Sequence, residues 1–361
     1  PMPTSRLLRS GLVLALAVAP GVAQTPFFAD GTAFGGSRVF SEGLNPLGNS
    51  ARLVQAPGGF YASWLEGGRE ASDAGEAIGK LAAGSASGVS QALRSLARDP
   101  WGTRLKGYGL AWVERGAMMS LTREELTGLQ VAADADPAHL DSAHALALNT
   151  STAELRRASV DRFVLGSSWR EGRVTYGGPL RVERHALGVR DLALNPAAGQ
   201  GALSGSAFDP WSFTSTSRRA VSATLDAGMT VAVSEALSVG FTTDRLLRRK
   251  IWDVEEKPQF RAGASLVLNS MLSVSAEADV NRAARFPFPG EQRTASASLR
   301  IALGQGLSLQ VGAERTSFGG TFVARGGVML RYRGAGMDLG LGFQAGADRP
   351  LKGASAAVVD L

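Results

Sequence analysis

The second half of the chain alternates apolar and polar residues one by one. A period of two places successive side chains on opposite faces of a β-strand. Apolar residues occupy alternate positions from Val221 to Val233, and Ser222, Thr224 and Asp226 fall on the other face. Because the same alternation returns in segment after segment up to residue 343, we expect amphipathic strands of about ten residues from residue 220 onwards.

The connections between these segments alternate in length. Alternation of residues alone also fits a soluble antiparallel sheet with one wet face. Tight links are expected at 234–237, 268–272, 303–307 and 333–337, and longer ones at about 247–258, 284–293, 316–321 and 347–352. Short turns on one rim and long loops on the other are typical of outer-membrane barrels. The prediction is therefore an all-β fold with helical insertions: a closed antiparallel transmembrane β-barrel of about 12 to 14 strands.

The N-terminus resembles an export signal. Arg6 and Arg9 precede the apolar run 11–19, and residues 21–23 supply small side chains for cleavage. The alternative is a buried apolar helix of a cytosolic protein. With the barrel pattern, an exported chain implies the bacterial outer membrane, so we assign residues 1–23 to a signal peptide.

The front half of the mature chain mixes strands with helical segments. Residues 24–60 are expected to form a plug or the first strand, 61–158 a region of strands and helical insertions, and 159–361 the main barrel hairpins. Within these ranges we expect helices at 72–83 and 87–97, a third helix opened by a capping box at 122–125, and a fourth with Pro137 in its first turn. Strands are expected at about 106–122 and as a hairpin at 159–183, and a long loop at 188–210.

Composition narrows the classes of protein to which the chain can belong. Gly accounts for 45 of 361 residues and aromatics for 7%, so no concentrated soluble core stands out. After the signal, the sequence contains no run of 18 apolar residues, so it predicts no helical membrane span. The chain has no Cys, which excludes disulfides and thiolate metal sites. Its net charge of +6 is dispersed, so we expect no nucleic-acid partner.

The sequence gives little support for catalysis or metal binding. The histidines are His139, His144 and His185, and the spacing of the first two does not place them on one helical face. Since no His-based constellation or paired carboxylates accompany them, we expect no metal, no cofactor and no enzyme activity.

The polar face of the strands carries charges of both signs. If the apolar face meets lipid, these residues face the lumen: Asp226, Arg261, Glu277, Asp279, Arg300, Glu314, Arg325, Arg331 and Asp338. They either pair with one another and fill the lumen, or line a permeation path or ligand pocket. A basic cluster, Arg245, Arg248, Arg249 and Lys250, falls on an expected outer loop, where it either contacts lipopolysaccharide phosphates or is simply solvated.

The C-terminal part of the chain resembles the TraF-like conjugal-transfer proteins, within the broader FadL and PorV type of outer-membrane barrel. The resemblance lies in residues 257–263 (KPQFRAG), 272–279 (LSVSAEAD), 310–314 (QVGAE) and 336–342 (GMDLGLG), and Asn45-Pro46 is similar to that family's front region. It implies passage of hydrophobic molecules for FadL-type members and a secretion role for PorV-type members. It carries no functional residue over to this chain.

Two functions follow as hypotheses. The first is a channel or transporter for a small hydrophobic molecule. The alternative is a structural or secretion- or conjugation-associated barrel whose lumen is filled and which transports nothing. In both cases the expected partners are outer-membrane lipid, lipopolysaccharide and the barrel-assembly machinery.

Overall fold

The structure is a computed structural model, and it describes residues 50–56, 58–68, 90–94, 101–114, 116–132, 134, 136–140, 148–194, 218–318, 321–345 and 349–359. Helical structure in these ranges is confined to short pieces: residues 90–94, η2 (Ser50–Gln55) and η3 (Pro137–Leu140). No helix in the described ranges is long and apolar enough to cross a membrane.

The chain forms a closed antiparallel barrel of 14 strands, which confirms the predicted fold class. Its first half is built from β1 (Gly59–Gly68), β2 (Trp101–Glu114), β3 (Ala117–Ala132), β4 (Thr152–Glu171), β5 (Val174–Ala193), β6 (Arg218–Leu225), β7 (Ala227–Ala232) and β8 (Leu237–Asp244). Its second half is built from β11 (Gln259–Val267), β12 (Leu272–Asp279), β14 (Phe288–Gly304), β15 (Leu307–Phe318), β16 (Thr321–Gly334), β17 (Met337–Ala345) and β18 (Arg349–Val359).

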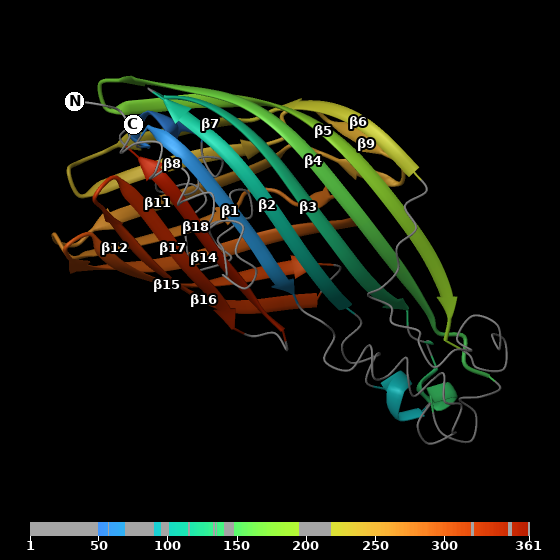
Figure 1. Ribbon diagram of the computed structural model, residues 1–361. Coiled ribbons are helices and arrows are strands. Elements are labelled where there is room, and N and C mark those ends of the chain that lie inside the picture. The colour runs from blue at the N-terminus through green and yellow to red at the C-terminus, as the bar shows by residue number, and fades with distance from the viewer. Residues whose placement is uncertain are drawn as a thin grey trace.

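Backbone pairing closes the wall in two places. Strand β1 pairs with β18, and β12 pairs with β14, so the sheet returns to its starting strand (Figure 1). Strands β6 and β7 share one position in the wall, because both pair with β5. Three short strands stand outside the ring: β9 (Arg249–Ile251) and β10 (Val254–Glu256) form their own hairpin, and β13 (Ala283–Arg285) pairs with β14.

The two rims differ in their connections. Tight hairpins at one rim confirm the four predicted links near residues 234, 269, 305 and 335, and Gly116 and Gly172 add two more. At the other rim, long connections join β1 to β2, β3 to β4, β5 to β6, and β8 to β11. The expected long links at 316–321 and 347–352 were wrong, since β15 and β16 are separated only by residues 319–320, and β17 and β18 only by 346–348.

The front half contains longer strands than the sequence predicted. The capping-box helix at 122–125 was wrong, because these residues lie within β3, where Thr122 is buried and Arg123 exposed. The hairpin expected at 159–183 is extended at both ends into β4 and β5, each of 20 residues, so β4 runs through residue 158 and β5 takes in the start of the loop expected at 188–210. Residues 90–94 are helical, as predicted for 87–97, whereas the expected helix at 72–83 lies outside the described residues. Pro137 opens a short 3₁₀ turn in place of the fourth helix.

The outer face of β2–β6 is layered across the strands. Strand pairing aligns an apolar row of Trp112, Met119, Leu165, Leu180 and Leu225, and the next row of Leu110, Leu121, Phe163, Val182 and Ala223. The third row, called the boundary row below, contains Tyr108, Arg123, Asp161, Arg184 and Val221. The fourth contains Lys106, Glu125, Ser159, Ala186 and Arg219.

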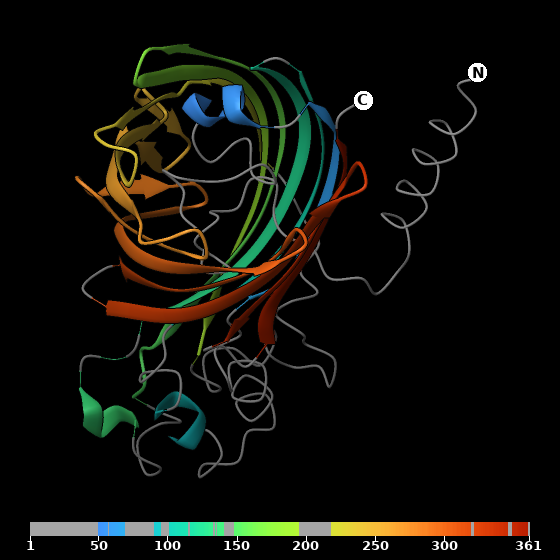
Figure 2. The same cartoon turned by 90° about the vertical axis from the view of Figure 1, so that its left-hand side faces the viewer.

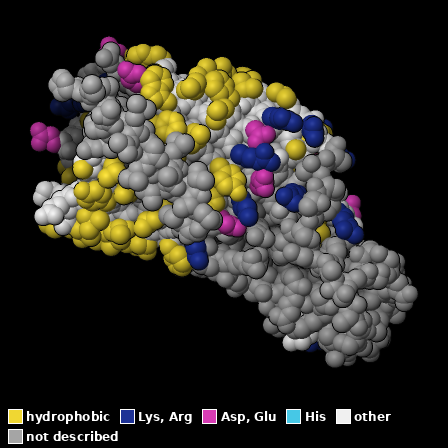
Figure 3. All heavy atoms as spheres, in the orientation of Figure 1, with side chains coloured by type: hydrophobic (Ala, Val, Ile, Leu, Met, Phe, Trp, Pro, Cys, Tyr) yellow, Lys and Arg dark blue, Asp and Glu magenta, His cyan; other side chains and the backbone are white. Residues whose placement is uncertain are grey.

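This layering is visible on the surface. Apolar side chains gather toward the rim of tight hairpins, and charged ones gather toward the rim of long connections (Figure 3). A barrel in a membrane presents an apolar band about 25 Å tall, bounded by aromatic and charged residues. The change from apolar to charged at the boundary row matches one edge of such a band.

We predict that an arginine is tolerated on one side of the boundary row and not on the other. Leu180→Arg places a charge among acyl chains and is expected to destabilise the barrel by about 2–4 kcal/mol, whereas Ala186→Arg, on the same strand and face, costs less than about 1 kcal/mol. Urea unfolding in phospholipid vesicles measures both. Equal costs would contradict the placement of the lipid band.

Candidate functional site

The predicted lumen residues lie mostly on the buried side of the wall. Those that are buried are Asp226, Arg261, Glu277, Asp279, Glu314, Arg331 and Asp338. Arg300 in β14 is half-buried, and the side chain of Arg325 in β16 lies outside the described residues. Their proposed role in lining a path or pocket stays a prediction.

One group of these residues pairs along the wall between β11 and β12. Arg261 donates from Nε to Asp279 Oδ1 at 2.7 Å and from Nη1 to Glu277 Oε1 at 2.9 Å. Asp279 also accepts from Gln259 Nε2 and from the backbone N–H of Thr294. Buried ions are tolerated when paired and hydrogen-bonded in this way. Arg331 and Asp338 form a similar two-pronged pair between β16 and β17.

A second buried network was not predicted from the sequence. Arg162 of β4 donates to Glu183 Oε1 of β5 at 2.8 Å and to Glu124 Oε2 of β3 at 2.8 Å. The other oxygen of Glu183 accepts from Arg249 of β9, which also donates to Glu256 Oε2 at 2.6 Å. These five residues, Glu124, Arg162, Glu183, Arg249 and Glu256, are called the interior network below. It joins three wall strands to the β9–β10 hairpin.

The β9–β10 hairpin packs against the inner face of the wall. Ile251 and Val254 form a buried apolar cluster with Ala158, Val160, Leu187, Ala284 and Phe286. The ring of Phe286 lies 5.0 Å from His185 and 5.7 Å from Trp252. At the hairpin turn, burial raises the pKa of Asp253, but the hydrogen bond and charge of Arg156 outweigh it and lower that pKa overall.

The wall departs from regular pairing at Asp226, between β6 and β7. The backbone N–H of Asp226 donates to Pro179 O at 3.0 Å, and its carboxylate accepts from the N–H of Arg245 at 2.7 Å and pairs with Arg181. Beyond this point β7 continues between β5 and β8, whereas β6 pairs with β5 alone in the described part of the chain. The chain after β8 turns into the inward hairpin, where the backbone N–H of Leu246 donates to Leu225 O and Arg249 donates to Ser222 Oγ.

The opposite end of the interior is occupied by the 3₁₀ turn η2. Leu53 is fully buried with Tyr61, Ala111, Val113, Met118, Val164, Ala357 and Val359. Figure 2 shows this turn, in blue, within the ring of strands. The described interior therefore has an apolar cluster near each rim, with the interior network between them.

Ser222, His185 and Glu183 lie together, although the sequence suggested no such group. His185 Nε2 is 2.9 Å from Ser222 Oγ and 3.5 Å from Glu183 Oε2, so one ring nitrogen faces both groups. A hydrolytic triad requires the carboxylate on the other nitrogen, to orient the ring. Ser222 Oγ also accepts from Arg249, which places a donor where a nucleophile would need a base. The geometry is that of a structural hydrogen-bond network.

The basic cluster expected on an outer loop is divided by the fold. Arg248 and Lys250 are exposed, and Arg248 pairs with Glu255. Arg245 and Arg249 instead point inward and pair with Glu256, Arg245 being buried. The prediction of a single solvated or lipid-contacting cluster was therefore wrong for these two arginines, because the chain turns inward after β8 and places both side chains inside the barrel.

Comparison with known proteins gives information about the fold. No family model matches the chain, and no curated protein matches its sequence. Among solved structures, a TodX monoaromatic hydrocarbon channel lacking S2 and S3 is similar with a TM-score of 0.57 at 12% identity, over 93% of this chain and 99% of that one. The TodX deltaS2 mutant gives a TM-score of 0.53 at 11% identity, over 92% and 98%. The toluene transporter TodX of P. putida gives 0.50 at 13% identity, over 93% and 96%.

The chain has the fold of a FadL-type barrel. At these identities the likeness concerns the fold alone. The finer resemblance to TraF-like proteins has no counterpart among these structures and stays a prediction.

We predict that the interior network is essential to the stability of the barrel. Glu183→Gln leaves Arg162 and Arg249 without a shared buried carboxylate and is expected to cost about 3–5 kcal/mol. The matched change Glu255→Gln removes an exposed pair with Arg248 and should cost no more than about 1 kcal/mol. Denaturant titration in detergent micelles compares the two, and a small loss for Glu183→Gln would argue against a tightly coupled network.

Proposed function

We propose that this protein is an outer-membrane channel for small hydrophobic molecules. Three features support the proposal: the closed barrel, the exposed apolar rows on its outer face, and a fold shared with monoaromatic hydrocarbon channels. The identity of the molecule carried is part of the proposal, and toluene, named for the TodX structures, is the first to test.

The edge of β6, which has no strand partner in the described part of the chain, is the observation that carries this proposal. Backbone groups at membrane depth cost several kcal/mol each when they lack partners, so barrels normally pair every strand on both sides. Here the edge of β6 has no pairing strand in the described residues, and Ala223 and Leu225 place it at the height of the two apolar rows. Under this proposal, a hydrophobic molecule passes between the barrel interior and the acyl chains at this discontinuity.

The arrangement of the buried charges also favours a channel over a filled lumen. Arg261 pairs with residues of the neighbouring strand, as do Arg331 and Arg162. Such pairs neutralise the wall locally and do not need to reach across the barrel axis. Other pairs also stay on one side of the wall: Arg249 and Asp253 hold the inward hairpin, and Arg181 reaches Asp244 at the end of β8. The alternative, a structural or secretion-associated barrel, predicts a lumen filled by charged pairs and without a continuous cavity.

A bulky side chain at the β6 edge is expected to hinder transport. Ala223→Trp places an indole at the discontinuity and should slow uptake of radiolabelled toluene by Gram-negative cells that express the protein. Ala297→Trp is the matched control, because Ala297 is exposed on β14 but pairs with both neighbouring strands. Outward aromatics are ordinary in barrels, so both variants should fold.

The same assay separates the two functions. If cells with the unaltered protein take up toluene no faster than cells without it, the hydrocarbon channel is contradicted and the structural barrel is favoured. If transport occurs but both Trp variants slow it equally, the hydrocarbon channel is supported and the route at the β6 edge is contradicted.

A further inference from the structure

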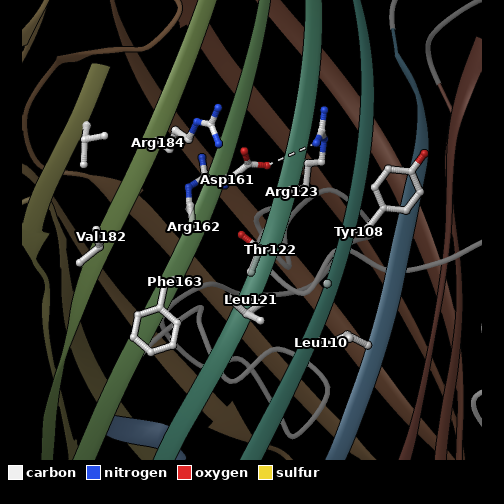
Figure 4. Close-up of a pocket in the computed structure, with 12 residues that line it drawn as sticks. Tyr108, Leu110, Leu121, Thr122, Arg123, Asp161, Arg162, Phe163, Val182 and Arg184 are labelled. Atoms are coloured by element: carbon white, nitrogen blue, oxygen red, sulfur yellow. Dashed lines mark ion pairs between the residues drawn. The ribbon is translucent and has the colours of Figure 1, made fainter. Parts of the chain in front are cut away.

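A shallow pocket lies on the outer face of the wall, and its lining includes Arg162 of the interior network. Its volume is about 510 Å³, within the range of small-ligand sites. Figure 4 shows Leu110, Leu121, Phe163 and Val182 in its lower part and Arg123, Asp161 and Arg184 in its upper part. The pocket therefore spans the last apolar row and the boundary row.

The arginines of this region differ in how far their charge is already neutralised. Arg123 donates to Glu125 Oε1 at 3.0 Å and lies 3.8 Å from Asp161 Oδ1. Arg184 is exposed in the boundary row, and no acidic partner for it is found among the described residues. Arg219 is likewise exposed and has no acidic partner within the described part of the chain. Two cations thus remain available beside the pocket.

Strand register brings these two cations together. Arg184 is paired with Val221, and Arg219 lies two residues before Val221 on the same outward face of β6. Diagonal neighbours of this kind have Cβ atoms on the order of 7–8 Å apart, which is within reach of long side chains. Both guanidinium groups can therefore approach one anionic group, and arginine binds phosphate through two parallel hydrogen bonds.

We propose that this outer pocket binds a phosphorylated, acylated glycolipid of the lipid A type, with its phosphate on Arg184 and Arg219 and an acyl chain over Leu121, Phe163 and Val182. The inference rests on the membrane location in the proposed function. The boundary row lies toward the rim of long connections, which in such barrels faces the exterior. The lipid beside that row therefore belongs to the outer leaflet, where an apolar floor below two cations suits this lipid.

The test uses the full chain, purified in an uncharged detergent and titrated with bisphosphorylated lipid A, with binding followed by native mass spectrometry. The Arg184→Gln/Arg219→Gln variant should bind at least about tenfold more weakly, since each lost charge-assisted hydrogen bond is worth more than about 1.4 kcal/mol. Arg170→Gln/Arg173→Gln is the matched control: it removes the same charge from exposed arginines at the tight hairpin between β4 and β5. It should bind like the parent. Heat-modifiable migration on gels checks that all variants are folded.

Three further ligands identify what is recognised. Dephosphorylated lipid A should bind the parent and the double variant equally weakly, and inorganic phosphate or phosphatidylglycerol should bind the parent more weakly than lipid A does. Equal binding of lipid A by the parent and the double variant would overturn the site, and equal binding of phosphatidylglycerol would overturn the choice of lipid. Toluene uptake is measured separately in cells. If the unaltered protein takes up toluene but does not bind lipid A, this inference alone is contradicted. If it binds lipid A but does not take up toluene, the channel alone is contradicted.

Discussion

Backbone hydrogen bonding within the wall is the constraint on which this structure depends. A strand that faces acyl chains has no water to satisfy its N–H and C=O groups, so each must find a partner on a neighbouring strand. The pairings of β1 with β18 and of β12 with β14 meet this requirement by closing the ring. Once the ring is closed, alternate side chains must point to opposite sides of the wall. The two outer rows nearest the tight hairpins are apolar, and the inner face holds paired charges.

The proposed function depends on the places where strand pairing in the wall is interrupted. At Asp226 the wall changes from β6 to β7, and the chain after β8 folds inward as β9 and β10 instead of extending the sheet. The inward hairpin is held by the interior network and by the apolar contacts of Ile251 and Val254. An inward hairpin and an edge of β6 without a strand partner in the described residues are thus two aspects of one arrangement. Under the proposed function, that edge would serve the exchange of molecules with the surrounding lipid.

The sequence predicted the barrel because period-two alternation is a local property. From residue 220 onwards, the tight turns and strand phases could be obtained from neighbouring residues alone. The front half was harder, because Thr122–Glu125 fits both a helix cap and a strand with Thr122 inside and Arg123 outside, and only pairing with β2 and β4 decides between them. The interior network brings together Glu124, Glu183 and Glu256 from distant parts of the chain, so no local pattern could reveal it. Arg249 and Arg245 looked like loop residues for the same reason.

The membrane placement of the barrel depends on which solvent the outer rows contact. Because the chain contains no cysteine, single cysteines at Leu165, Leu180, Ser159 and Ala186 can each carry one nitroxide label without background. In phospholipid vesicles, we predict that labels at 165 and 180 are accessible to dissolved oxygen and shielded from a water-soluble nickel complex, and that labels at 159 and 186 show the opposite. Accessibility of all four positions to the nickel complex would contradict it.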